Sequence, residues 1–579
     1  MRQTLQTEVL VVGGGTGGVA AALTAARLGA QTVLVSETPW LGGMLTSAGV
    51  AAPDGNELMA WQTGLWGKFL RAIARRQPGG LDHAWVSFFT FEPKVAADLF
   101  AEWVKATPNL TWIVGEVPQA VLRRGDRVFG VEFGALTVHA QITVDATELG
   151  DLLALGDIPH RWGWEWQSDT QEPSAPSAPT PLTRTYPVQA PTWIVVLQDY
   201  GEGATAPEIS PSPLWDEDKF NGAWAGYDPL HFLNYGRLPG NRFMLNWPQQ
   251  GNDYGVGLER LVGSPQERQA FCQEARWHAQ DFACYIQRHF GRRYGLAADT
   301  FPRFPNRIGG GAYALHPYYR ESRRLIGLTT IREQDILPAA PPPRDSQGHY
   351  TGIAIGNYPN DHHYPGMALP LMPKSIRWGG RWTGTPFVIP YTALIPQEVE
   401  GFLVAEKNIS VSHIANGATR LQPVVMGIGQ GAGWLAATAI RHGKSLQQLV
   451  GNLDLKSLIQ ECYQAVFPFF NLPPQHSEWE AWQLQTLETF DAPLALPWTV
   501  AIAQPTPMSI TSEMQTVTGE FVKLGEQSYQ LRTAEQSWPL VTLHPTVNDL
   551  LQMCRHGQRL SVTGFLNPHA PWIRVEHVA

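Results

Sequence analysis

Short apolar runs alternate with glycine-rich turns over the first forty positions of the chain. Residues 9–12 are uniformly apolar, as in a buried parallel strand. An alanine-rich run, 19–28, predicts a helix that ends at Gly29, and residues 31–36 predict a second buried strand. The order strand, helix, strand predicts a βαβ unit at the N-terminus.

Later runs extend this pattern. Three predict strands that return to the same sheet: residues 111–114, 128–133 and 141–146. Ser264 and Glu267 have the spacing of a capping box and predict a long helix that ends near Phe290. Between 168 and 192 proline, serine and threonine replace most aliphatic residues, which predicts an exposed loop.

The last 65 residues have a different pattern. Three alternating runs, a capped short helix and two more alternating runs predict the order β-β-β-α-β-β, which is the order of a small OB-like β-barrel over 515–579. Such barrels can bind single-stranded nucleic acid, but basic and acidic residues are balanced here, so we expect a structural or assembly module. Its apolar side, with Phe521, Leu543 and Phe565, is expected to pack on the main body or on a second subunit of a homo-oligomer.

The turn after the first strand has the spacing G-x-G-x-x-G at Gly13, Gly15 and Gly18. Gly13 permits a tight turn, Gly15 leaves room for a pyrophosphate, and Gly18 lets the helix lie close to the strand. The positive end of the helix then faces the phosphates. Glu37, 19 residues beyond Gly18, is placed to accept hydrogen bonds from a ribose. The sequence therefore predicts a dinucleotide site.

A second glycine-rich region covers residues 401–433, where an apolar strand leads into a polar loop and then into a Gly/Ala helix. Small residues at the start of that helix would let a planar ring lie against its N-terminus, whose dipole stabilises the negative charge of a reduced flavin. The alternative is a tightly packed core helix. The N-terminal motif favours the cofactor interpretation.

With these motifs the chain resembles the FAD-dependent oxidoreductases that are distant relatives of the fumarate reductase and succinate dehydrogenase flavoproteins. The resemblance covers most of residues 8–445 and is carried by seven segments: 13–18, 41–46, 144–151, 317–324, 356–363, 389–391 and 410–433. It implies an α/β, two-domain FAD-binding fold of the Rossmann type, glutathione-reductase-like, with an inserted substrate domain. The domains would be 1–165 and 389–450 for FAD, 166–388 for the substrate, 451–514 as a helical connector, and 515–579 as the barrel.

The resemblance also implies which residues lie along the FAD, with the helix after Gly429 facing the pyrimidine edge of the isoalloxazine. The predicted cofactor residues are Gly13, Gly15, Thr16, Gly18, Glu37, Gly42, Gly43, Met44, Thr46, Val117, Asp145, Thr147, Asp151, Gln430 and Gly431.

Candidate catalytic residues come from three of these segments. His413 and Arg420 lie in a stretch similar to the family motif His-Gly-Ala-Asn-Arg-Leu-Gly-Gly, but Arg420 and Leu421 are followed by Gln-Pro, so a dicarboxylate-reducing site is not supported. Arg320 belongs to an arginine cluster that either binds a carboxylate or joins a buried structural network. His363 stands near Asp361, and such a pair can exchange protons at neutral pH.

Composition and charge limit which partners, cell compartments and metal sites can be expected for this protein. Hydrophobic residues make up 44% and charged residues 16% of 579, and the net charge of −9 has no acidic or basic blocks, so neither nucleic acid nor an anionic membrane is expected as a partner. The chain begins directly with a strand, and its apolar stretches are interrupted before they reach the length needed to span a bilayer, so we expect a cytoplasmic protein. The four widely spaced cysteines predict reduced thiols, and no spacing typical of a metal site is found.

These observations predict an oxidoreductase that transfers a hydride between a small organic substrate, such as an amine, an alcohol, a sugar or an acid, and flavin N5. Two alternatives remain open at this point: an RNA-acting flavoprotein that uses the C-terminal barrel, and a non-catalytic FAD-holding interaction protein.

Overall fold

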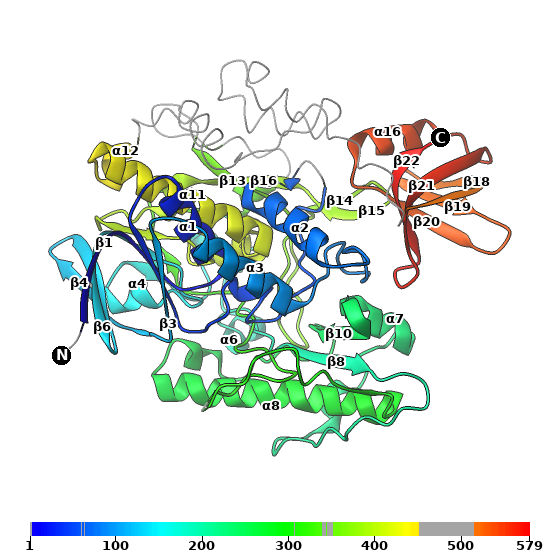
Figure 1. The fold of residues 1–579 in the computed structure, drawn as a ribbon, viewed down its shortest axis with the longest axis horizontal. Coiled ribbons are helices and arrows are strands. Elements are labelled where there is room, and N and C mark those ends of the chain that lie inside the picture. The colour runs from blue at the N-terminus through cyan, green and yellow to red at the C-terminus, as the bar shows by residue number, and fades with distance from the viewer. Residues whose placement is uncertain are drawn as a thin grey trace.

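A seven-stranded sheet forms the centre of the largest unit in the structure, a computed structural model that describes residues 3–58, 61–62, 64–305, 307–337, 343, 351–450 and 514–579 (Figure 1). Four strands run parallel in the order β3-β2-β1-β6: Leu110–Val114, Thr32–Ser36, Gln3–Val12 and Leu136–Asp145. β17 (Phe402–Val404) pairs in parallel with the end of β6, while β4 (Pro118–Arg124) and β5 (Arg127–Phe133) form an antiparallel extension. All five strands predicted for this sheet are confirmed.

Two helices pack together against this sheet. α1 (Thr16–Arg27) begins three residues earlier than the sequence pattern suggested, because the glycine turn leads directly into the helix. α11 (Gln422–His442) also begins earlier than the expected start near Gly429. Pro423 at its first turn explains this start, since proline fits the first turn of a helix, where its missing N–H is not needed.

The expectation that no apolar stretch is long enough to span a bilayer is wrong for α11. By length and composition this helix alone, within the described part of the chain, passes such a test, but nearly all of it is buried inside the fold. An added Cβ at Gly433 would lie 2.2 Å from the Ala21 carbonyl oxygen of α1. The absence of side chains at such positions brings the two backbones together, as in the core of a globular domain.

The middle of the chain forms a second unit. Its antiparallel sheet has the order β11-β8-β10-β9, formed by Tyr294–Leu296, Val195–Asp199, Arg242–Leu245 and Arg237–Leu238. α8 (Pro265–Phe290) lies along this unit (Figure 1). Both hydrogen bonds of the predicted Ser264–Glu267 capping box are present, so this helix is confirmed.

Shorter elements connect the units. The helices are α2 (Gly64–Arg76), α3 (Pro93–Lys105), α4 (Asp151–Leu155), α5 (Gln167–Thr170), α6 (Pro181–Thr185), α7 (Pro229–Leu233), α9 (Glu333–Ile336), α10 (His413–Thr419) and α12 (Leu446–Leu449). The strand pairs are β7 (His160–Arg161) with β12 (Arg324–Leu325), β13 (Gly352–Asn357) with β16 (Pro386–Pro390), and β14 (Ser375–Trp378) with β15 (Arg381–Gly384).

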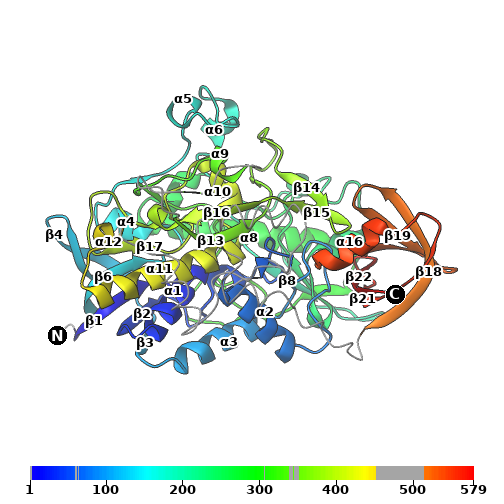
Figure 2. The ribbon, with the colours of Figure 1, turned by 90° about the horizontal axis from the view of Figure 1, so that it is seen from above.

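The segment 168–192 is less exposed than its composition suggested. α5 and α6 project from the body of the molecule (Figure 2), but Glu172 and Gln189 are buried. Glu172 accepts a hydrogen bond from the Glu333 backbone N–H at 2.7 Å. The prediction of a wholly exposed loop is therefore wrong, because buried polar groups of this segment are paired with the main body.

A closed barrel forms the C-terminal unit, with neighbours in the order β18-β19-β20-β22-β21. Its elements are β18 (Gln515–Gly525), β19 (Ser528–Arg532), β20 (Ser537–Val541), α16 (Pro545–Met553), β21 (Arg559–Asn567) and β22 (Trp572–Val578), which is the predicted element order. Phe521 lies in the barrel's own core, whereas Leu543 packs into the core of the main body. The predicted connector 451–514 lies, except for Met514, outside the described residues.

Candidate active site

The N-terminus of α1 lies where the predicted pyrophosphate site requires it. Gly13 has φ = +114°, and an added Cβ would lie 2.0 Å from the Ala146 carbonyl oxygen. A Cβ on Gly18 would lie equally close, 2.0 Å, to the Gly13 carbonyl oxygen. These two glycines therefore close the turn, whereas Gly15 has an ordinary φ of −66° and faces side chains instead of backbone.

The loop after β2 packs on this turn. Gly42 donates its backbone N–H to Gly14, and the Thr16 hydroxyl donates to the Gly42 carbonyl at 2.7 Å. A Cβ on Gly43 would lie 2.7 Å from the Cα of Gly15. The predicted cofactor residues 13–18 and 42–46 are thus brought together, although Thr46 uses its hydroxyl within its own loop, on Leu41.

At the carboxyl edge of the sheet, the predicted cofactor residues Glu37 and Val117 are more exposed to solvent than those of the glycine turn. Glu37 follows β2 and forms an ion pair with Arg307. Val117, which follows β3, is half exposed. Since both residues come after adjacent parallel strands, they lie at the edge where such sheets bind nucleotides.

Other predicted residues have partners within the protein. Asp145 is buried and accepts two hydrogen bonds from Thr147, and burial, against these bonds, raises its pKa to about 7. Asp151 pairs with Arg268 at 2.8 Å and with Arg323 at 3.2 Å. These pairs assign Asp151 to a structural network that also holds part of the arginine cluster.

Gln430 and Gly431 lie in the interior of α11, eight and nine residues after its start. The Gln430 side-chain oxygen accepts the Leu65 N–H at 3.0 Å, and Gly431 packs on Ile353. Gln422, at the start of α11, lines the main cavity instead. The early start of the helix therefore places Gln422, not Gln430, at the helix N-terminus.

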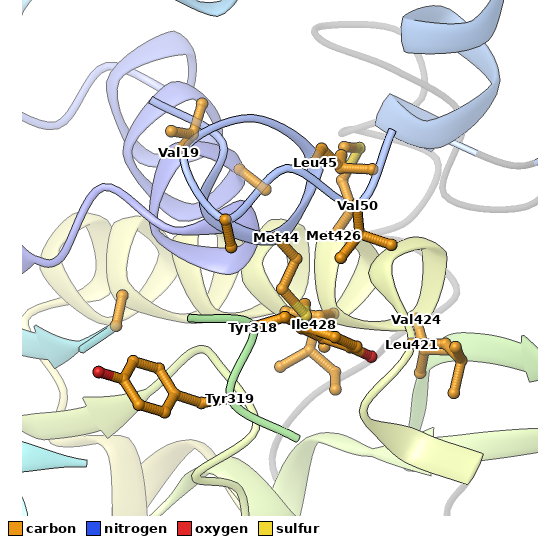
Figure 3. Close-up of a cluster of buried hydrophobic side chains, with 14 of the residues drawn as sticks. Val19, Met44, Leu45, Val50, Tyr318, Tyr319, Leu421, Val424, Met426 and Ile428 are labelled. Atoms are coloured by element: carbon orange, nitrogen blue, oxygen red, sulfur yellow. The ribbon is translucent and has the colours of Figure 1, made fainter. Parts of the chain in front are cut away.

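The residues present fit a dinucleotide with a flavin ring. The N-terminus of α1 already holds an anion, because the Gly17 N–H donates to the Glu406 carboxylate at 2.7 Å. Buried side chains of Met44, Tyr318 and Ile428 lie close to one another between the glycine turn and α11 (Figure 3). At the end of this apolar cluster Gln422 has a buried side-chain oxygen without a partner in the described part of the chain. The N-terminus of α1 can thus bind the phosphates, the apolar cluster can contact a flavin ring, and Gln422 can bind a polar atom of that ring.

A cavity of about 580 Å³ opens beside that edge. Its wall includes side chains from three parts of the chain: Asp253 from the middle unit, Tyr318 and Arg320 from the segment after it, and Asp361, His363 and Arg420 from residues 361–420. The structure therefore gathers three of the four predicted catalytic residues around one space.

His363 is held between two carboxylates on this wall. Its Nδ1 lies 2.7 Å from Asp253 Oδ2, and its Nε2 lies 2.8 Å from Asp361 Oδ2. Asp253 is buried, whereas the Asp361 side chain is 40% exposed toward the cavity side. The three side chains form a hydrogen-bonded row, Asp361–His363–Asp253. Its outer member, Asp361, is accessible to a molecule in the cavity.

The charges of this row fix its protonation. Burial and Arg320 lower the pKa of His363, but Asp361 and Asp253 outweigh them and raise it above its ordinary value. The pKa of Asp361 is lowered far below its usual range, because His363 and Arg420 outweigh the partial burial of its carboxylate. The pKa of Asp253 falls to about 2 despite burial, through Arg320 and His363. Both carboxylates are therefore held in the ionised form, and the imidazole binds a proton more tightly than a free histidine does.

Both predicted arginines face the cavity but are already paired. Arg320 lies 3.0 Å from Asp253 Oδ1 and donates to the Ala190 carbonyl at 2.6 Å. Arg420 donates to the Tyr318 hydroxyl at 2.6 Å and to Asp361 at 3.1 Å. Because each guanidinium already neutralises a carboxylate, the cavity has no surplus positive charge that would select an anionic substrate.

His413 does not reach the cavity. It is fully buried, its Nδ1 lies 2.8 Å from Glu321, and its Nε2 lies 2.6 Å from the Tyr364 hydroxyl. Tyr364 and His362 line the cavity in front of it. The structure thus separates His413 from the other three candidates by one layer of side chains.

Sequence reasoning missed several residues of the cavity. Asp253 stands in no recognisable motif, and Asp54 follows Thr46, the last residue of the glycine loop, by eight residues without a distinct pattern. Burial and Glu57 raise the pKa of Asp54 to about 7 despite Arg381. Tyr318 lies in segment 317–324, which carries part of the family resemblance, but only its contact with Arg420 shows its place in the site.

Solved structures that match parts of this chain share little sequence with it. A geranylgeranyl bacteriochlorophyll reductase-like protein from Thermoplasma acidophilum is 10% identical over 80% of this chain and 84% of its own, with a TM-score of 0.31. L-proline dehydrogenase from P. horikoshii is 18% identical with a TM-score of 0.16, and the match covers 28% of this chain and 25% of that one. pqsL, a probable FAD-dependent monooxygenase from Pseudomonas aeruginosa, is 16% identical with a TM-score of 0.22, and the match covers 35% of this chain and 52% of that one.

The family model described as FAD dependent oxidoreductase matches residues 8–461. This range contains the glycine turn, the cavity and α11, and it ends before the barrel. Because the match covers well over half of the 579 residues, the chain belongs to the FAD dependent oxidoreductase family, and FAD is its cofactor.

Proposed function

We propose that this enzyme oxidises a small organic substrate, such as an amine, an alcohol, a sugar or an acid, in the cavity beside Gln422. The observation that carries the proposal is the row Asp361–His363–Asp253, whose outer carboxylate faces the cavity. FAD, when bound, would supply the two-electron acceptor for this oxidation, since flavin N5 can take up a hydride.

The side chains of the row supply the matching proton transfer. As the substrate loses a hydride from carbon, its O–H or N–H proton passes to the Asp361 carboxylate and on to Nε2 of a neutral His363. Asp253 keeps the ring oriented, and Arg420 holds Asp361. Because Asp361 and His363 exchange the proton between them, the apparent pKa seen in the rate belongs to the row as a whole and not to one residue.

The proposed cofactor contacts follow the described geometry. Residues 13–18 and 42–46 would hold the pyrophosphate and ribityl part, Glu37 and Val117 the adenosine end, and the start of α11 the flavin ring. We further propose a glutathione-reductase-like arrangement of the two main units, supported by the parallel order β3-β2-β1-β6.

We propose that the barrel is an OB-like module with a structural role. Its closed order β18-β19-β20-β22-β21, with β20 and β22 parallel, supports the OB-like assignment. Its basic side chains are matched by acidic ones, which favours assembly over binding to nucleic acid.

Anaerobic reduction of the bound FAD tests the function. The full-length protein is mixed with panels of amines, alcohols, sugars and acids, and loss of oxidised-flavin absorbance is followed. With the best substrate, His363→Ala is expected to slow reduction by roughly 10²- to 10⁴-fold, the usual contribution of a positioned acid–base group, at unchanged FAD content.

His442→Ala, at the C-terminal end of α11 and far from the row in sequence, is the control and should reduce at the wild-type rate. If no panel member reduces the flavin, or if His363→Ala behaves as His442→Ala does, the proposed proton transfer is wrong.

A further inference from the structure

Three buried charges meet at the N-terminus of α1. The Lys407 ammonium lies 2.6 Å from Glu148 Oε2 and 3.3 Å from Glu406 Oε2. Glu406 and Lys407 are completely buried, and Glu148 comes from the turn between β6 and α4. Two carboxylates therefore share one cation, so the cluster has a net negative charge when both are ionised.

Glu406 also fills the space that Gly15 leaves open. A Cβ on Gly15 would lie 2.4 Å from Glu406 Oε1, and this same oxygen accepts the Gly17 N–H at 2.7 Å. Glu148 Oε1, which has no hydrogen-bond partner among the described residues, would lie 3.3 Å from that Cβ. A carboxylate of the protein thus binds the helix N-terminus that attracts phosphate, and an unpaired buried oxygen lies beside it.

The pyrophosphate of FAD brings two further negative charges to this place. Besides Lys407, the groups facing the cluster are His316, whose Nε2 lies 2.9 Å from the Ser47 hydroxyl, and Tyr318. Neither supplies a second permanent cation. Like charges at such short range in a buried site disfavour one another strongly, so one carboxylate must lose its charge when the pyrophosphate binds.

We propose that Glu406 couples cofactor binding to proton uptake: its carboxylate takes one proton from solvent as the FAD pyrophosphate binds at the N-terminus of α1. The neutral carboxyl group then gives up its bond to the Gly17 N–H and can donate to a phosphate oxygen. No other bond forms or breaks, and the proton is returned to solvent when FAD leaves.

The electrostatics of the cluster select Glu406 over Glu148. Burial and Glu148, opposed by Lys407, raise the pKa of Glu406 to about 7. In Glu148, by contrast, Lys407 and His316 overcome burial and lower the pKa. Glu406 therefore binds a proton more readily than an ordinary glutamate before any phosphate arrives, and a phosphate raises its proton affinity further.

FAD affinity measured against pH tests this proposal. Holoprotein is diluted at several pH values between 6 and 8.5, and free FAD is quantified after ultrafiltration. Because one proton is taken up above the pKa of the free site, Kd should be nearly constant below about pH 6.5 and should rise by up to roughly tenfold per pH unit above about pH 7. ADP-ribose, which has the same pyrophosphate and no flavin, should show the same slope in competition.

Glu406→Gln should remove the pH dependence and bind FAD at least about as tightly at pH 8.5 as the wild type does at pH 6. Glu148→Gln keeps the titrating group but removes a neighbouring negative charge, so its rise in Kd should begin at lower pH. Glu172→Gln is the matched control, since Glu172 is also buried with a raised pKa but contacts Ser412 and Glu333 instead of the cluster, and it should follow the wild type.

A wild-type Kd that does not change with pH, or a Glu406→Gln protein with the wild-type slope, would overturn the proposal. Both outcomes concern binding alone, so they are independent of whether His363 takes part in turnover.

Discussion

At the scale of single residues, the two histidines proposed from the sequence have different surroundings. His363 contacts two carboxylates on the cavity wall, whereas His413 is enclosed by Glu321 and Tyr364. A buried residue with two polar partners contributes mainly by keeping those partners satisfied. Any effect of His413 on the chemistry passes through Tyr364 or His362, the two side chains that separate it from the cavity.

His413→Ala is therefore expected to lower the free energy of unfolding by about 1–3 kcal/mol, since it leaves buried polar groups without partners. Flavin reduction should slow far less than in His363→Ala. Denaturant unfolding and anaerobic reduction of the same preparations check both expectations. A stable His413→Ala protein with a loss of rate as large as that of His363→Ala would show that His413 takes part in proton transfer directly.

At the scale of elements, the turn between β1 and α1 separates folding from cofactor binding. An added Cβ on Gly18 meets the carbonyl oxygen of Gly13, which cannot move without opening the turn, whereas one on Gly15 meets the end of the Glu406 side chain. Gly18→Ala should lower the melting temperature. Gly15→Ala should keep the fold but weaken FAD binding by about tenfold or more, since overpacking of this kind costs about 1–3 kcal/mol.

Thermal unfolding and FAD stoichiometry measured on both variants check this separation. Gly525→Ala is the control, because an added Cβ there has open space around it. The expectation fails if Gly15→Ala melts as early as Gly18→Ala does, or if it retains FAD with wild-type affinity.

The elements themselves could be predicted where local signals are strong. Mainly apolar runs identified five of the seven strands of the sheet, and the Ser264–Glu267 box identified the start of α8. The start of α11 was misplaced because its small residues suggested a beginning near Gly429, while the signal of Pro423 was overlooked. Residues 168–192 were misjudged because composition does not show that Glu172 is buried against Glu333.

The site could be predicted only in part, because some of its residues are far apart in the sequence and meet only in the folded protein. His363, Arg320 and Arg420 stand in segments with recognisable motifs, but Asp253 comes from a loop more than one hundred residues away from His363. Pairs of this kind depend on how the units fold together. The same applies to Glu148 and Glu406, which were not among the predicted cofactor residues.

At the scale of the whole molecule, two parts of the main body contact the barrel: the segment that holds Asp82, and the β14–β15 hairpin, where Arg377 donates to the Gln527 carbonyl at 3.2 Å and to the Ser528 hydroxyl at 3.0 Å. Asp82, on the segment between α2 and α3, accepts hydrogen bonds from Asn567 at 2.7 Å and from the Trp572 indole at 3.1 Å, and Trp572 packs on Phe88. Figure 2 shows the barrel at one end of the molecule, away from the N-terminus. Loss of these contacts should loosen the barrel without disturbing the FAD site.

Asp82→Ala is accordingly expected to speed the release of the barrel under limited proteolysis, while the FAD content of the intact protein stays the same. Asp98→Ala, at an exposed position of α3 that pairs with Lys94, is the control. Loss of FAD from a folded Asp82→Ala protein would show that the barrel supports the cofactor site.

The central claim is that the row Asp361–His363–Asp253 accepts the substrate proton, and the pH dependence of flavin reduction in Asp361→Asn tests it most directly. His363 must be neutral to accept a proton, so the wild-type rate should rise with pH through an inflection above the ordinary histidine pKa of about 6.5. Removing the Asp361 charge lowers the pKa of His363, so in Asp361→Asn the inflection should move to lower pH while the maximum rate falls. An inflection that stays in place, or moves to higher pH, would contradict the account.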